Sequence, residues 1–251
     1  RGSQPTRVSV RLVLAALHAD IEGMRLLAIV LAVPALVLGW QWWSDRAVER
    51  RLEPIVSAIS GRDVAVDCQT LWGALVDTQR RHGEVVFDRN GIPEPRIFLT
   101  HDTCDRLGAF ADAARHGELA CLAAVNWAAE GALAFGSGCY EQASDTVYAL
   151  LTLAHESYHT AGVLNEADAN CLATQAMGYA ATALGAPQDE ALLAARAMAV
   201  LLPRQLDAYR TADCVPGSRL DLHPATEAFP TELPIVPPYG RGGRPGLASG
   251  A

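Results

Sequence analysis

The sequence predicts an α+β domain that is predominantly helical, contains a small β-hairpin or sheet, and follows an N-terminal transmembrane helix. Three observations favour this fold class. Apolar residues recur at helical spacing in most of the Ala-rich chain after residue 100, two short β-prone runs enclose a turn signal, and one N-terminal run carries no charge. The expected organisation is an extension (1–25), a membrane anchor (26–43), one folded domain (44–228) and a Pro/Gly-rich disordered tail (229–251).

Residues 26–43 read LLAIVLAVPALVLGWQWW and end in three tryptophans. This length suits a membrane span, and tryptophan is enriched at membrane interfaces. The bulky residues at its end offer no small-residue cleavage site, which favours an uncleaved anchor over a signal peptide. A buried core helix is the alternative. We therefore expect a single-pass protein of the cell membrane, although arginines on both sides leave its orientation open.

All six cysteines follow this segment, without C-x-x-C spacing. This pattern favours disulfides formed in an oxidising compartment, and so a domain outside the cytoplasm, over a second metal site; some buried free thiols remain the alternative. Of the fifteen possible connectivities we predict one pair, Cys171 with Cys214. That pair would tie a helix to the segment that carries His223.

The remaining elements follow from local patterns. Helical spacing predicts a charged helical stem at 45–59 and further helices at 67–81, 105–135 and 187–202, the last ended by Pro203. The β-prone runs 84–87 and 96–100 flank Asn90-Gly91-Ile92-Pro93, which predicts a hairpin. The net charge of −8, with Arg80-Arg81-His82 among the longest basic clusters, makes a nucleic acid a poor partner for this chain.

The most informative segment is His155-Glu156-Ser157-Tyr158-His159. Two histidines four residues apart share one face of a helix, and a glutamate beside the first can deprotonate a metal-bound water. A helix over about 146–160, capped by Ser144 or Asp145 and ended at Ala161-Gly162, would turn one apolar stripe to the core. The stripe contains Val147, Leu150, Leu151, Ala154 and Tyr158; the histidines lie on the adjoining face with Tyr148 and Thr152, and Glu156 lies towards the open side.

A second acidic segment, Asn165-Glu166-Ala167-Asp168-Ala169-Asn170, follows after a short turn. On a helix Glu166 and Asn170 share a face, whereas Asp168 points about 200° away from Glu166. Glu166 is therefore the better third metal ligand, and Asn170 can hydrogen-bond a ligand imidazole. If the turn does not form, Asp168 or water takes the third place. Three protein ligands leave a fourth position for water.

These two segments, about 16 residues in all, resemble the gluzincin class of zinc metallopeptidases. The resemblance implies a zincin-like domain that hydrolyses a peptide or protein substrate, with His155, His159 and Glu166 as Zn²⁺ ligands, Glu156 as general base and Asn170 as a supporting residue. The chain departs from the usual pattern in the gap of only seven positions between His159 and Glu166, and in Asn rather than Asp at position 170. Zincin-type peptidases commonly hold substrate against an edge strand, for which 96–100 is our choice.

Catalysis also needs a hydrogen-bond donor for the developing oxyanion. We select His223 for this role, on a segment that could cover the site; the other candidates are Tyr158, Tyr179 and Arg210. Two different interpretations stay open. The histidines could be satisfied core residues of a structural interaction protein, or the same ligands could form a catalytically inactive zinc-binding or sensor module.

Overall fold

The computed structural model describes residues 30, 32, 36–39, 41–70, 73, 82–127 and 138–224. The chain divides into two compact units, Arg1–Ser44 and Asp45–Ala251. The expected extension (1–25) and tail (229–251) lie outside the described residues, as does half of the expected anchor (26–43). Across the described ranges, no helix is both long and apolar enough to cross a membrane.

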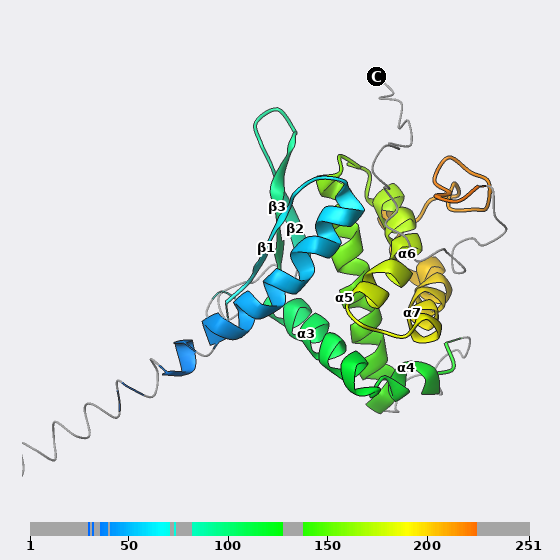
Figure 1. The fold of residues 1–251 in the computed structure, drawn as a ribbon. Helices are drawn as coiled ribbons and strands as arrows, with labels where there is room; N and C mark the ends of the chain where they lie inside the picture. Colours follow the sequence, from blue (N-terminus) through cyan, green and yellow to red (C-terminus); the bar gives the residue numbers. More distant parts are fainter. Residues whose placement is uncertain are drawn as a thin grey trace, which may run out of the picture. The chain divides into compact units, whose positions relative to one another are not determined.

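The second unit is predominantly helical and contains one small sheet, as the sequence predicts (Figure 1). A helix over residues 45–60 comes first. After it come β1 (Ala65–Cys68), β2 (Gly83–Phe87), β3 (Pro93–Leu99), α3 (His101–His116), α4 (Ala120–Ala124), α5 (Gly138–Thr160), α6 (Glu166–Ala183), α7 (Gln188–Leu201) and the 3₁₀ turns η2 (Leu202–Arg204) and η3 (Asp207–Tyr209).

The three strands are ordered β1-β3-β2. β2 and β3 form the predicted antiparallel hairpin, whose turn contains Gly91 at φ +74°, a conformation that a side chain disfavours. β1 pairs with β3 in parallel, with Val66 opposite Ile97. The prediction of a helix from residue 67 is wrong at its start, because Asp67 and Cys68 end β1. The choice of 96–100 as the edge strand is also wrong, because β3 is paired on both sides and β1 and β2 are the edges of this sheet.

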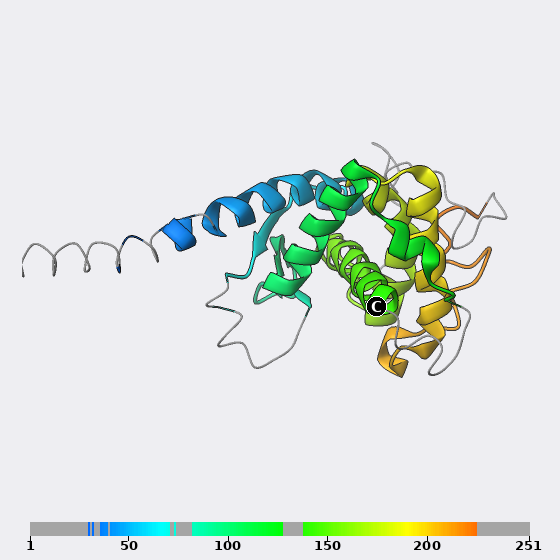
Figure 2. The same cartoon turned by 90° about the horizontal axis from the view of Figure 1, so that it is seen from below.

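Helix α5 forms the centre of the unit. Its predicted core stripe is confirmed, since every member from Val147 to Tyr158 is at most 6% exposed. It contacts α6 and α7 as well as α3, β2 and β3, so it lies between a helical layer and the sheet (Figures 1 and 2). The helix begins at Gly138, two turns before the predicted start. The Cys121–Cys139 disulfide ties this early turn to α4, and Tyr140 and Ala143 are buried there.

The helix over residues 45–60 is part of the core and not the predicted stem. Leu52, Val56 and Ile59 are fully buried, at one-turn spacing along one face. Two further disulfides, Cys68–Cys104 and Cys171–Cys214, join β1 to α3 and α6 to the segment after η3. The predicted Cys171–Cys214 pair is therefore confirmed, and the chain has the disulfides expected of an oxidising compartment.

Candidate metal centre

The turn that ends α5 brings the chain back to its own histidines. Gly162 adopts φ +95°, its N–H donates to the His159 carbonyl at 2.9 Å, and the Val163 N–H donates to the Tyr158 carbonyl at 3.0 Å. This pair of bonds is the Schellman arrangement, which glycine accommodates because it has no Cβ. The predicted turn at Ala161-Gly162 is therefore formed.

Helix α6 begins only three residues later. The Asn165 side chain caps it by accepting the Asp168 N–H at 2.9 Å, which makes Glu166 its first residue. The Glu166 carboxylate then reaches both histidines, with Oε2 3.0 Å from His155 Nε2 and Oε1 3.4 Å from His159 Nε2. The tight turn and the cap explain how a gap of seven residues suffices.

These three side chains have the geometry and chemistry of a metal site. Their donor atoms all lie within 4.8 Å of one another. The two N···O separations are close to the distance of about 3.3 Å expected between two ligand atoms of a tetrahedral metal ion whose bonds are about 2.0–2.1 Å long. Two imidazoles and one carboxylate suit zinc and similar divalent ions. The group of His155, His159 and Glu166 can thus hold a metal ion.

His159 is held in the tautomer that metal binding needs. Its Nδ1 lies 2.6 Å from the Val163 carbonyl oxygen, which can only accept, so Nδ1 carries the proton and the Nε2 lone pair faces Glu166. Burial and the neighbouring His155 lower the pKa of His159, which keeps the ring neutral. Hydrogen bonding to His155 lowers the pKa of Glu166, which keeps its carboxylate charged.

Glu156 lies beneath the edge strand and not on the open side that the helix pattern predicts. It is 7% exposed, and burial raises its pKa to about 7 in the metal-free protein. Gly83 of β2 covers it so closely that a Cβ at this position would lie 2.9 Å from Glu156 Cγ. The strand can approach the carboxyl group only because residue 83 has no side chain.

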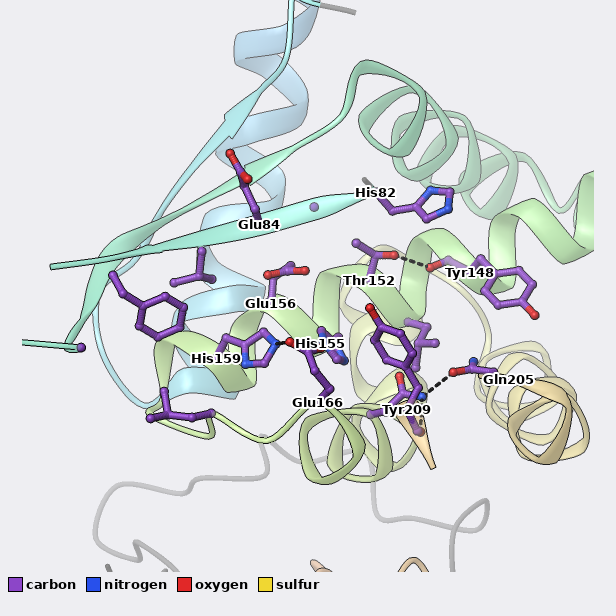
Figure 3. Close-up of a pocket in the computed structure, with 17 residues that line it drawn as sticks. His82, Glu84, Tyr148, Thr152, His155, Glu156, His159, Glu166, Gln205 and Tyr209 are labelled. Carbon is purple, nitrogen blue, oxygen red and sulfur yellow. Dashed lines mark hydrogen bonds and ion pairs between the residues drawn. The ribbon is translucent and has the colours of Figure 1, made fainter. Parts of the chain in front are cut away.

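The three possible ligands His155, His159 and Glu166, called the metal group below, and Glu156 line one cavity of about 780 Å³. β2 forms one wall, α5 the floor, and the start of α6 with the 202–210 segment the opposite wall (Figure 3). Tyr148 and Thr152, predicted to share the histidine face of α5, line this cavity together with His155 and His159.

Asn170 contributes differently from the prediction. It is buried, and its Nδ2 donates to Gln205 Oε1 at 2.6 Å and to the Tyr209 carbonyl at 3.1 Å. The prediction was that Asn170 hydrogen-bonds a ligand imidazole, whereas the other ring nitrogen of His159 binds the Val163 carbonyl and His155 Nδ1 is buried without a hydrogen-bond partner among the described residues. Asn170 thus holds the segment that carries Tyr209, whose ring centroid lies 6.1 Å from that of His155.

Asp168, the alternative third ligand, forms an ion pair with Arg219. Its two oxygens accept hydrogen bonds from both terminal nitrogens of Arg219, at 2.8 and 2.9 Å. This bidentate pair points the carboxylate away from the histidines, in agreement with the helical geometry that favours Glu166 as the third ligand.

The selected oxyanion donor, His223, is not among the residues described as lining the cavity. The backbone on either side of Asp221 is bound to Gln175, which accepts from the Leu222 N–H and donates to the Leu220 carbonyl. Gln175 lies nine residues beyond Glu166 on α6, a distance of about 13 Å along the helix axis. The segment that precedes His223 is therefore bound to the middle of α6, away from Glu166 at its start.

The other three candidates are also not among the residues described as lining the cavity. Tyr158 is fully buried in the core, Tyr179 lines a second cavity with Arg51, and Arg210 pairs with Asp207 and the Pro203 carbonyl. Tyr209 and Gly83 were not predicted from the sequence as residues of the site. The signal for Tyr209 was its position five residues before Cys214, because the predicted disulfide from Cys214 to α6 brings the segment that carries Tyr209 towards the site.

Among the residues that the structure describes, His155, His159 and Glu166 are the group able to hold a metal ion. The site is defined by this geometry alone, because no protein-family model, curated protein or solved structure matches the chain.

Proposed function

We propose that this chain is a zinc-dependent peptidase of the gluzincin type. The observation that carries the proposal is the meeting of three elements in one cavity: the His155, His159 and Glu166 group, the buried carboxyl of Glu156, and the edge of β2 that faces away from β3. The donor set of two nitrogens and one oxygen matches catalytic zinc sites.

Glu156 serves as the general base. A bound zinc ion supplies Lewis acidity to a water molecule and to the scissile carbonyl, and its charge favours the carboxylate form of the neighbouring glutamate. The Glu156 carboxylate accepts a proton from the attacking water and returns it to the leaving nitrogen. Its burial beneath Gly83 excludes bulk water and keeps its pKa close to the range needed for both transfers.

Tyr209 is the best placed donor for the developing oxyanion. Its ring lies beside His155 in the same cavity (Figure 3). Burial raises the pKa of the Tyr209 hydroxyl, with a further increase from Glu166 and Glu156, so the phenol keeps its proton at neutral pH. The Asn170 hydrogen bond to its carbonyl holds the backbone that carries this ring.

The edge of β2 provides backbone groups for an extended peptide. The Thr100 N–H donates to the His82 carbonyl, so the alternation of an antiparallel pair directs the backbone of residues 82 and 84 towards β3. The backbone groups of Gly83 and Val85 then face the cavity side. A substrate strand that pairs with these groups passes directly over Glu156.

The proposed location is the outer face of the cell membrane, with residues 26–43 as a single-pass anchor. Two features support it: the uncharged run of eighteen residues and the three disulfides, which form in oxidising compartments.

The test measures metal content and cleavage of a peptide library by the zinc-loaded chain. Glu156→Gln should retain zinc and lose at least about 10²-fold in activity, because the amide cannot accept the proton. His159→Ala should lose the metal, whereas Asp168→Ala is the matched control that retains it. A Glu156→Gln protein as active as the parent would overturn Glu156 as the general base. A zinc-loaded parent that cleaves nothing would instead support the alternative of a non-catalytic metal-binding or sensor module.

A further inference from the structure

We propose that the cleft selects substrates with a large apolar residue within about four positions on the N-terminal side of the scissile bond. The inference rests on the proposed peptidase function and adds a direction and a side-chain preference to it. It follows from the uneven distribution of apolar and polar side chains along the cavity.

The end of the cavity next to His159 is apolar. The Val163 carbonyl binds His159 Nδ1, so the adjacent Leu164 lies at this end, where it lines the cavity and is 61% exposed. Phe87, at the far end of β2, lines the same cavity and is 40% exposed. Two large apolar side chains exposed to water inside a concave site are typical of a surface that a ligand covers.

The opposite end of the cavity is polar. Tyr148, Thr152, Gln205 and Tyr209 line it, on the side of the metal group away from His159 (Figure 3). His82 also lies at this end, immediately before β2 (Figure 3). The strand therefore runs from the polar end at His82 to the apolar end at Phe87.

The position of Glu156 along β2 sets where the reacting bond lies. A Cβ on Gly83 would meet both Glu156 and Thr152, so the reacting bond lies opposite the first residue of β2. Phe87 is four residues further along the strand, about 13 Å away. The apolar end thus lies to one side of the reacting bond, at the distance of a few substrate residues.

The direction of the substrate follows from strand pairing. An antiparallel partner makes the more stable ladder, and β2 already pairs in this way with β3. A peptide antiparallel to β2 enters at Phe87 and leaves at His82. Its residues before the scissile bond therefore pass Phe87 and Leu164, and its residues after the bond pass the polar end.

The experiment is to identify all cleavage sites that the zinc-loaded full chain produces in a mixture of unfolded proteins, by mass spectrometry of the new termini. We expect Leu, Phe, Ile and Met to be enriched within about four positions before the cleaved bond. In matched peptides, Leu should exceed Ser there by about tenfold or more in kcat/KM.

Variants then assign the preference to its residues. Phe87→Ser with Leu164→Ser should reduce the Leu-to-Ser ratio to about one, with zinc content unchanged. Ile92→Ser, which removes an exposed apolar residue of the hairpin turn outside the described cavity lining, should leave the ratio unchanged.

Three outcomes would overturn the inference, and they separate it from the proposed function. Cleavage with apolar residues enriched after the bond would show a parallel substrate, and cleavage without enrichment would show that the apolar end is not a subsite; both leave the peptidase function in place. Absence of any cleavage by the zinc-loaded chain would overturn the peptidase function and this inference together.

Discussion

Replacing Glu156 by Gln should stabilise the metal-free protein at alkaline pH while it removes the proposed base. The Glu156 carboxyl is 7% exposed, and burial raises its pKa from 4.5 to about 7. A carboxyl whose pKa is higher in the folded than in the unfolded chain stabilises the fold less as the pH rises, because the folded state binds the extra proton. Gln carries no such charge at any pH.

The magnitude follows from the pKa difference. The unfolded chain loses its Glu156 proton near pH 4.5 and the folded chain near pH 7. The penalty therefore grows across this window and reaches about 3 kcal/mol above it, at about 1.4 kcal/mol for each pKa unit. Relative to the parent, the free energy of unfolding of the Gln variant should be little changed at pH 4.5 and higher by about 3 kcal/mol at pH 8.

Urea unfolding of the chelator-treated parent and variant at pH 5 and pH 8 measures this difference. Glu94→Gln, an exposed carboxyl on β3, is the control and should show almost no dependence on pH. A Glu156→Gln gain that is equal at both pH values, or larger at pH 5, would refute the assignment of Glu156 as a carboxyl kept uncharged by burial.

Three further predictions concern single residues, two of them in the walls of the cavity. Gly83→Ala should lower kcat by about 10-fold to 10²-fold with zinc content unchanged, because its Cβ would lie 2.9 Å from Glu156 and displace it. Asn170→Asp should lower activity by about tenfold or more, although Asp is usual in gluzincins, because a carboxylate cannot donate to the Tyr209 carbonyl; an equally active variant would contradict this. Arg219→Ala should change the unfolding free energy by less than about 1 kcal/mol, since its pair with Asp168 is half exposed.

The local sequence was sufficient to predict a feature wherever the physical cause of that feature lies within one or two helical turns. The core stripe of α5, the shared face of His155 and His159, and the turn at Gly162 all follow from helical spacing and from the conformational freedom of one glycine. Glu166 could be chosen over Asp168 for the same reason, and the structure brings Glu166 to the histidines.

The disulfide between Cys171 and Cys214 was a correct choice, but only one of many that the sequence allowed. Strand β1 was missed, although its buried residues Val66 and Cys68 alternate with the more exposed Ala65 and Asp67. Its parallel pairing with β3 joins residues about thirty positions apart, and a pattern of four residues carries no information about such a partner.

The sequence by itself therefore determined the helical character of this protein, the side chains able to hold a metal ion and the turn that brings them together. Only the tertiary structure decided which strands are the edges of the sheet, what covers Glu156 and which tyrosine lies beside His155. Gly83 lies 73 residues before Glu156, and Tyr209 lies 39 residues after Asn170. Contacts of this kind depend on how the sheet and the 202–210 segment pack against α5 and α6, and packing of distant segments leaves no periodic trace in the chain.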